Sequence, residues 1–180
     1  MMYPSAYIQY LVHFHGDRDY FECHEILEEY WKGLPNENKQ SIWVGFILLA
    51  VSNYHYRRQN TNGAERTLQK AITILRKQQK TPIQLGLDFP KLLLGLEKRL
   101  VDIQTNQHYH SINLPIIDEK LLNLCLSYTE AMGLAWGQDS NLHQMDIIDR
   151  HKLRDRSEVV KQRHQALYMK RTQKESREPN

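Results

Sequence analysis

The sequence predicts an all-α fold: a bundle of about five helices, extended by an additional helix and by a partly helical basic C-terminal tail. Apolar residues recur at spacings of three and four through the first part of the chain, as they do along one face of a helix. Capping residues, glycines and prolines separate these periodic segments. The stretch 112–116 alternates as a strand does, but Pro115 argues for an edge segment or a loop.

The first two helices are predicted from their end signals. Ser5 can cap a helix over residues 5–15, and Gly16 follows it as a stop signal. Asp19 then opens a second helix, with Glu22 three residues on as a variant of the capping box. This second helix is amphipathic, because one face is apolar and a second stripe is acidic.

The third helix is predicted over residues 37–59, and it should be the most buried. Its middle, 42–51, is apolar on nearly all sides, which is typical of a helix surrounded by others. Gly45 lies within this run and lowers helix stability by roughly 1 kcal/mol relative to alanine. A close helix crossing at Gly45 would explain why a glycine stands there.

Two further helices follow. A turn over residues 60–63 precedes a fourth helix at 63–79. Asp88 begins a fifth helix, with Pro90 in its first turn, where a proline is well tolerated. We therefore assign residues 1–104 to one helical bundle.

The rest of the chain has a different character. Residues 105–139 are predicted to form an extended linker and an accessory helix that begins near Glu119. Residues 140–180 hold ten Lys/Arg and six Asp/Glu, so the excess positive charge of the chain belongs to this basic, partly helical or disordered tail.

The composition indicates a cytoplasmic protein without a membrane segment. The chain has 180 residues, of which 41% are hydrophobic and 25% charged, as in ordinary globular proteins. Cys23 and Cys125 each lie on a predicted apolar face, which favours buried free thiols in a reducing compartment. The N-terminal residues do not form a secretory signal, and the apolar run 42–51 is too short to span a bilayer.

The first candidate site combines a histidine with carboxylates. His24 and Glu28 are four residues apart and lie one above the other on a helix. Both can ligate a divalent metal such as Zn²⁺, with His55 as a third ligand, whereas Glu25 would lie outside that face. The alternative is a structural His–carboxylate hydrogen bond between the second and third helices. We favour this alternative because buried polar groups are generally paired.

The second candidate is a polar cluster at the end of the third helix. Its arginines could bind an anionic ligand, or they could pair with the acidic stripe of the second helix, which we favour. If His55 reaches His24, the two clusters border one pocket. The candidate ligand-binding residues are His24, Glu25, Glu28, His55, Arg57, Arg58 and Asn60. The candidate metal ligands among them are His24, Glu28 and His55.

The ordered motifs resemble the DUF309 family of small helical proteins. They comprise Tyr20-Phe21-Glu22-x-His24-Glu25-x-Leu27-Glu28-x-x-Trp31, Gly45-Phe46-Ile47-Leu48-x-Ala50, His55, Arg58-x-Asn60 and Gly63-Ala64. The resemblance covers roughly residues 7–100. It implies an all-helical bundle in a cytoplasmic protein of bacterial type, and it implies no activity.

Three functional hypotheses follow. We favour a non-catalytic binding or interaction module whose partner is another protein or a second copy of the chain. The alternative is a metal-dependent hydrolase that uses His24, Glu28 and His55 as ligands. The least favoured hypothesis is a nucleic-acid contact through the tail 140–180, because acidic residues interrupt its positive charge.

Overall fold

The computed structural model describes residues 3–35, 38–78 and 85–150, and within these ranges it contains helices and no strand. An isolated bridge joins Leu87 to Ile116. The predicted all-helical bundle is confirmed. The helices are α1 (Ser5–His15), α2 (Tyr20–Lys32), α3 (Ile42–Arg57), α4 (Thr61–Gln78), α5 (Phe89–Gln104), α6 (Glu119–Ala131) and α7 (Met145–Ile148).

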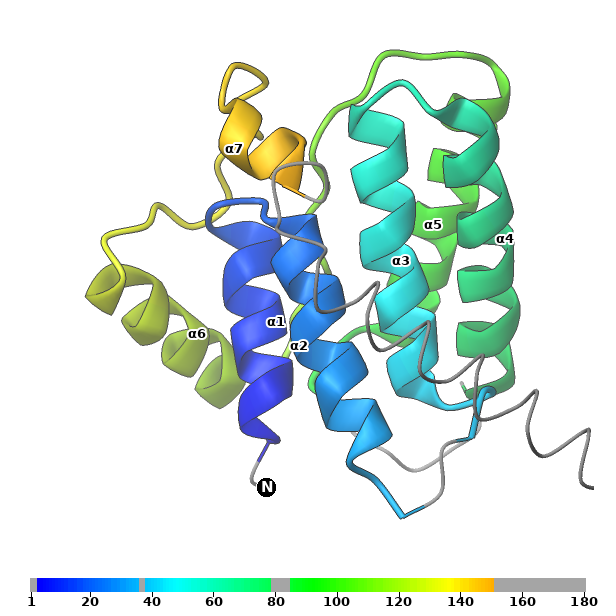
Figure 1. The fold of residues 1–180 in the computed structure, drawn as a ribbon. Coiled ribbons are helices and arrows are strands. Elements are labelled where there is room, and N and C mark those ends of the chain that lie inside the picture. The colour runs from blue at the N-terminus through cyan, green and yellow to red at the C-terminus, as the bar shows by residue number, and fades with distance from the viewer. Residues whose placement is uncertain (1–2, 36–37, 79–84, 151–180) are drawn as a thin grey trace, which may run out of the picture. The chain divides into compact units, whose positions relative to one another are not determined.

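The helices pack mainly with their neighbours in the chain. Helix α3 lies between α2 and α4, α5 packs on α4, and α1 contacts α2 on one side and α6 on the other (Figure 1). The core is therefore built around α3, whose buried residues lie on nearly all of its sides. This confirms the prediction that the apolar third helix is the central one.

Gly45 marks a close crossing of α3 and α4, as its place in an apolar helix predicts. A Cβ atom at this position would lie 2.8 Å from Leu75 Cδ2 and 2.9 Å from Leu75 Cγ. Leu75 itself is fully buried, so it has little room to move. The absence of a side chain at Gly45 thus permits closer packing of the two helices, and the lower helix propensity of glycine is the cost.

Aspartate caps confirm the predicted starts of two helices. The Glu22 N–H donates to Asp19 Oδ1 at 3.0 Å at the start of α2, and the Lys91 N–H donates to Asp88 Oδ1 at 3.0 Å at the start of α5. Each bond satisfies a backbone donor that has no partner within its helix.

Other helix ends differ from the prediction. Ser5 does not cap α1: Pro4 occupies the N-cap position, no side chain caps the helix, and Ser5 is its first residue. Helix α3 starts later than predicted, at Ile42, because Ser41 Oγ accepts a hydrogen bond from the Trp43 N–H at 3.3 Å. Helix α4 starts slightly earlier than predicted, because Asn60 Oδ1 accepts from the Gly63 N–H at 3.0 Å.

Residues up to Ile148 form one compact unit, and a second begins at Asp149. The predicted tail beyond residue 150 lies outside the described residues, as does the nucleic-acid contact assigned to it. The division of the chain at residues 104 and 139 stays a prediction. Cys23 and Cys125 are free and buried, as predicted. Within the described ranges, no helix is both long and apolar enough to cross a membrane.

Candidate functional site

His24, Glu25 and Glu28 form a cluster on the partly exposed side of α2. His24 Nδ1 lies 3.1 Å from Glu25 Oε1, and His24 Nε2 lies 3.5 Å from Glu28 Oε2. Lys32 Nζ approaches the second carboxylate, at 3.2 Å from Glu28 Oε1. One ligand atom from each member of the His24, Glu25 and Glu28 cluster lies within 4.8 Å of the others, so this set could hold a metal ion. Glu25, expected outside the ligating face, therefore belongs to the cluster.

His55 does not join this cluster. It is not among the ligand atoms that gather around His24. Its Nδ1 instead lies 3.1 Å from Asn60 Nδ2, so the amide can donate to a neutral imidazole. Burial, followed by the positive charges of Arg58 and Arg66, lowers the pKa of His55 and favours that neutral form. The described residues thus bring Glu25, and not His55, to His24.

The two candidate arginines have different surroundings. Arg57 is buried, and its Nη1 donates to Arg18 O at 2.7 Å and to Ser140 Oγ at 2.8 Å. Its guanidinium carbon also lies 5.0 Å from the centre of the Tyr20 ring. Arg58 is only partly buried, and its guanidinium lies 5.3 Å from the centre of the Tyr54 ring. Arg57 therefore holds a turn and a distant loop together.

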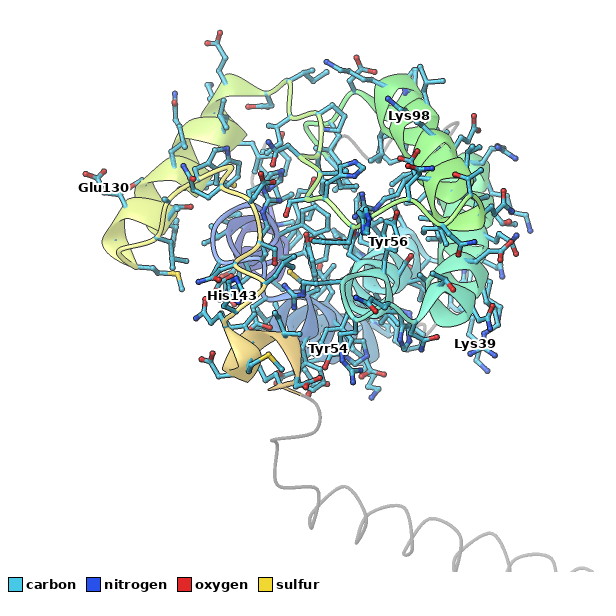
Figure 2. All side chains as sticks on the ribbon, turned by 90° about the horizontal axis from the view of Figure 1, so that it is seen from above. Lys39, Tyr54, Tyr56, Lys98, Glu130 and His143 are labelled. Atoms are coloured by element: carbon cyan, nitrogen blue, oxygen red, sulfur yellow. The ribbon has the colours of Figure 1, made fainter. Side chains whose placement is uncertain are left out.

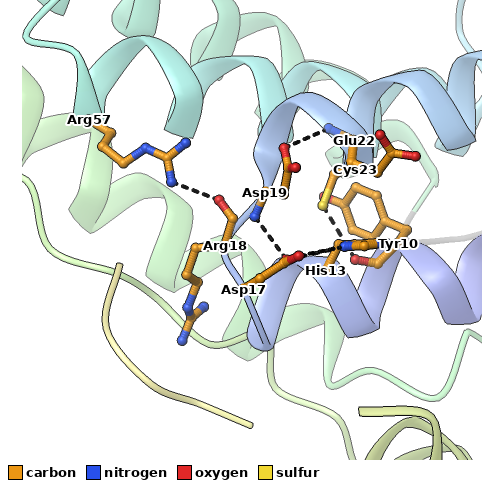
Figure 3. A network of polar contacts seen from close by, with 8 residues as sticks. All are labelled: Tyr10, His13, Asp17, Arg18, Asp19, Glu22, Cys23 and Arg57. Carbon is orange, nitrogen blue, oxygen red and sulfur yellow. Dashed lines mark hydrogen bonds and ion pairs between the residues drawn. The ribbon is translucent and has the colours of Figure 1, made fainter. Parts of the chain in front are cut away.

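The network around Arg57 continues through the turn between α1 and α2 (Figure 3). His13 Nδ1 lies 3.1 Å from both oxygens of Asp17, and Asp17 Oδ1 accepts from the Asp19 N–H at 3.1 Å. Arg57 reaches the carbonyl of Arg18 in the same turn. Arg18 has a φ of 59°, in the left-handed region. These contacts fix the turn in a conformation that most residues disfavour.

Arg18 is an anchor that the sequence did not reveal. Its side chain is 1% exposed. The guanidinium donates to four acceptors that come from three parts of the chain. They are Phe14 O at 2.7 Å, Ile112 O at 2.8 Å, Asn113 Oδ1 at 2.7 Å and Gln138 O at 2.7 Å. Arg18 therefore attaches the segments before and after α6 to the end of α1.

His15 supports the same attachment. The ring is buried, its Nδ1 lies 2.8 Å from Leu11 O, and its Nε2 accepts from the Leu114 N–H at 2.9 Å. It stacks on Trp136 with ring centres 4.3 Å apart. Burial lowers the pKa of His15 to about 4, and the nearby charge of Arg18 acts in the same direction. His15 is therefore neutral in the folded protein near pH 7.

A third buried arginine, Arg99 on α5, holds the segment after that helix. Its Nη2 donates to His110 O at 2.8 Å, and its guanidinium carbon lies 5.0 Å and 5.3 Å from the ring centres of Tyr56 and Tyr109. The hydroxyls of Tyr109 and Tyr20 are 2.8 Å apart. A small pocket of about 320 Å³ opens nearby, between the end of α3 and residues 106–109.

A second pocket is a groove of about 670 Å³ lined by residues of α3 and α4, together with Trp31 and residues 39–40. We call it the α3–α4 groove. Its apolar lining consists of Trp31, Val44, Leu48 and Ile74. Its basic lining consists of Lys39, Arg66, Lys70 and Lys77, and Gln40, Gln69 and Thr73 complete it.

The α3–α4 groove is positively charged and has no acidic residue in its lining. Within the described ranges, none of its four basic side chains lies within 4.0 Å of a carboxylate, and Lys77 Nζ donates to Gln40 Oε1 at 3.3 Å. Arg76, on another side of α4, does pair with Glu97 at 2.6 Å. The charge of the groove is thus left without a carboxylate partner in this part of the chain.

The groove was not among the sites predicted from the sequence, although a signal exists. Arg66, Lys70 and Lys77 are separated by four and seven residues, which places them on one face of α4. The apolar residues Val44 and Leu48 are likewise four apart on α3. The spacing therefore predicts each wall separately, and the structure brings the two walls together.

Comparisons with known proteins identify relatives but no activity. The family model described as a domain of unknown function (DUF309) matches residues 7–67. The chain is 49% identical over 166 residues to the "Uncharacterized protein YpuF" of Bacillus subtilis (strain 168), which covers 92% of this chain and 95% of that protein. No solved structure matches the chain at a significant level.

Proposed function

The chain belongs to the DUF309 family, and from this premise we propose that it is a non-catalytic binding module of the cytoplasm that holds a partner protein in the α3–α4 groove. The single observation that carries the proposal is the composition of this groove: an apolar floor partly open to solvent on the central helix, bordered by basic side chains. Binding sites for proteins commonly combine an apolar centre with a polar rim.

The floor of the groove supports a binding role. Helix α3 is otherwise the most buried helix, yet Val44 and Leu48 remain partly accessible on its outer side. When a partner covers these apolar side chains, their removal from water stabilises the complex by about 25 cal/mol per Å² of apolar surface buried. The groove volume of about 670 Å³ also lies within the range of roughly 300–1,000 Å³ that is usual for ligand pockets.

The remaining candidate residues support a role without catalysis. Arg57 donates to a backbone carbonyl and to Ser140, and His55 pairs with Asn60, which itself caps α4. These side chains hold elements of the fold together. Arg57, His55 and Asn60 are therefore engaged in structural contacts.

A peptide selection tests the groove directly. We expect peptides of about 16 residues, selected from a random displayed library against the intact chain, to bind about tenfold more weakly to Leu48→Lys than to the unchanged protein. The reason is that the new ammonium group must be desolvated in the floor. Fluorescence anisotropy with the selected peptides measures the affinity.

The matched control is Leu94→Lys, because Leu94 is 69% exposed on α5 and does not line the groove. Circular dichroism and thermal unfolding of both variants verify that they fold. Selected peptides that bind equally well to Leu48→Lys and to the unchanged chain would refute the proposed site. A selection that yields no binding peptide would count against the proposal as well.

A second candidate function is the binding of a divalent cation by His24, Glu25 and Glu28, which their ligand atoms within 4.8 Å favour. Titration of the purified chain with Zn²⁺, followed by calorimetry, should then show one site that His24→Ala weakens about tenfold. His143→Ala, at an exposed histidine, is the control. Equal Zn²⁺ binding by both variants would contradict this candidate and the metal-dependent hydrolase hypothesis with it.

A further inference from the structure

Resting on the proposed function of the α3–α4 groove, we infer that the occupant is an amphipathic helix of a partner protein with acidic residues along one flank. Its apolar face would lie on the floor formed by Val44, Leu48 and Ile74. Its carboxylates would face Arg66, Lys70 and Lys77 on α4.

The spacing of the basic residues fits a helical occupant. Arg66, Lys70 and Lys77 lie on one face of α4 and extend over about 16 Å along its axis, at 1.5 Å per residue. Carboxylates on a second helix that runs alongside α4 would recur at matching intervals of three, four and seven residues. Recognition of an amphipathic helix in an apolar groove uses the same spacing for its apolar anchors.

Three of the four basic residues that line the groove lie on α4, which favours an occupant with only one acidic flank. On α4, Lys70 and Lys77 line the groove, whereas the partly exposed side of α2 carries Glu25 and Glu28. Helix α3 lies between these two helices (Figure 1). From α2 only Trp31 lines the groove, so an acidic residue on that flank of the occupant would find no basic partner there.

Other occupants have less support from the charge and the chemistry of the groove. The C-terminal residues 140–180 of the same chain carry a net positive charge, which is the wrong sign for the basic lining. A nucleic acid would pair with the basic residues, but its phosphates gain nothing from the aliphatic floor formed by Val44, Leu48 and Ile74. An acidic amphipathic helix satisfies both the floor and the charge.

The test uses two designed, fluorescein-labelled peptides of about 18 residues, which have leucines at identical helical positions. One peptide carries glutamates on a single flank, and the other carries lysines at the same positions. We expect the acidic peptide to bind about tenfold more tightly to the intact chain, and to lose affinity between roughly 50 and 300 mM salt. Fluorescence anisotropy reports both affinities.

A double charge reversal locates the contact. Lys70→Glu with Lys77→Glu should weaken binding of the acidic peptide about tenfold, or more, because it replaces attraction by repulsion. The matched control is Lys91→Glu with Lys98→Glu, two exposed lysines that are also seven residues apart but lie on α5. Lys98 lies at the outer surface of the bundle (Figure 2). The control pair should leave the affinity unchanged.

The outcomes separate the occupant from the groove itself. Equal binding of the acidic and basic peptides, or binding of neither, would overturn the inferred occupant. Library-selected peptides that depend on Leu48 but have no acidic excess would also overturn it, while the proposed function of the groove would stand. Tighter binding of a single-stranded DNA of similar length, or a dimer that Leu48→Lys dissociates in sedimentation, would assign the groove to a nucleic acid or to a second copy.

Discussion

Replacing Arg18 with alanine is expected to lower the free energy of unfolding by about 4 kcal/mol, at about 1 kcal/mol for each hydrogen bond that is lost. The Arg18 side chain is 1% exposed and donates to four oxygen acceptors. Its removal deprives these four buried or partly buried acceptors of their donor and also leaves a cavity. The backbone contributes little to the difference, because arginine and alanine are similarly disfavoured at the φ of 59°. Urea unfolding followed by circular dichroism measures the change.

The control is an arginine with a partner at the surface. Arg76 is 59% exposed and pairs with Glu97, which is 46% exposed, so Arg76→Ala should cost less than about 1 kcal/mol. The Arg18→Lys variant keeps the charge but not the planar fork, and it should fall between the other two. Equal losses in Arg18→Ala and Arg76→Ala would show that Arg18 does not anchor the segments around α6.

Acidification is expected to destabilise the protein through His15. Burial lowers the pKa of His15 from its usual 6.5 to about 4. The unfolded chain therefore binds a proton between these pH values while the folded chain does not, so stability falls as the pH drops from about 6.5 to about 4. The pKa difference corresponds to a loss of about 3 kcal/mol. Protonation would also remove the acceptor that His15 Nε2 offers to the Leu114 N–H.

This effect can be isolated by comparing variants across pH. Urea unfolding of the unchanged chain and of His15→Gln, at several pH values from about 7.5 to about 4, should show the difference in stability shrinking as the pH falls. His143→Gln, at an exposed histidine, should follow the unchanged chain throughout. A stability difference between His15→Gln and the unchanged chain that stays constant with pH would contradict a neutral, buried His15.

The helices could be predicted largely because their signals are local. The aspartate caps at Asp19 and Asp88 bond to residues three positions away, and the crossing at Gly45 follows from a small residue in an apolar run. Ser5 failed as a cap because Pro4 already occupies the N-cap position. Local sequence patterns thus predict that a helix is present more reliably than they predict the residues at which it begins and ends.

The buried anchors could not be predicted, because their partners are distant in the sequence. Three of the four acceptors of Arg18 lie 94 to 120 positions away, and the Leu114 N–H that donates to His15 is 99 positions away. Neither residue belongs to a motif. A contact between neighbouring residues also escaped prediction. Glu25 reaches the imidazole of His24, although adjacent residues on a helix seldom face each other.

The basic stripe on α4 lies between these cases. The spacing of Arg66, Lys70 and Lys77 is visible in the sequence, but an exposed basic face is common on helices. The basic face indicates a binding site only because it lies beside Val44 and Leu48 on α3 in one groove. The two helices approach closely at Gly45, which brings these residues together. The candidate site therefore follows from packing more than from any single motif.

The most direct measurement is a map of amide chemical shifts of the isotope-labelled chain as the acidic amphipathic peptide is added. Binding in the α3–α4 groove predicts shifts concentrated at residues 44–48 and 66–77, which lie on the two walls of the groove. It also predicts that the Lys70→Glu, Lys77→Glu variant loses these shifts. Shifts concentrated on α5 or α6, or no shifts at peptide concentrations about tenfold above that of the protein, would contradict the groove as the binding site.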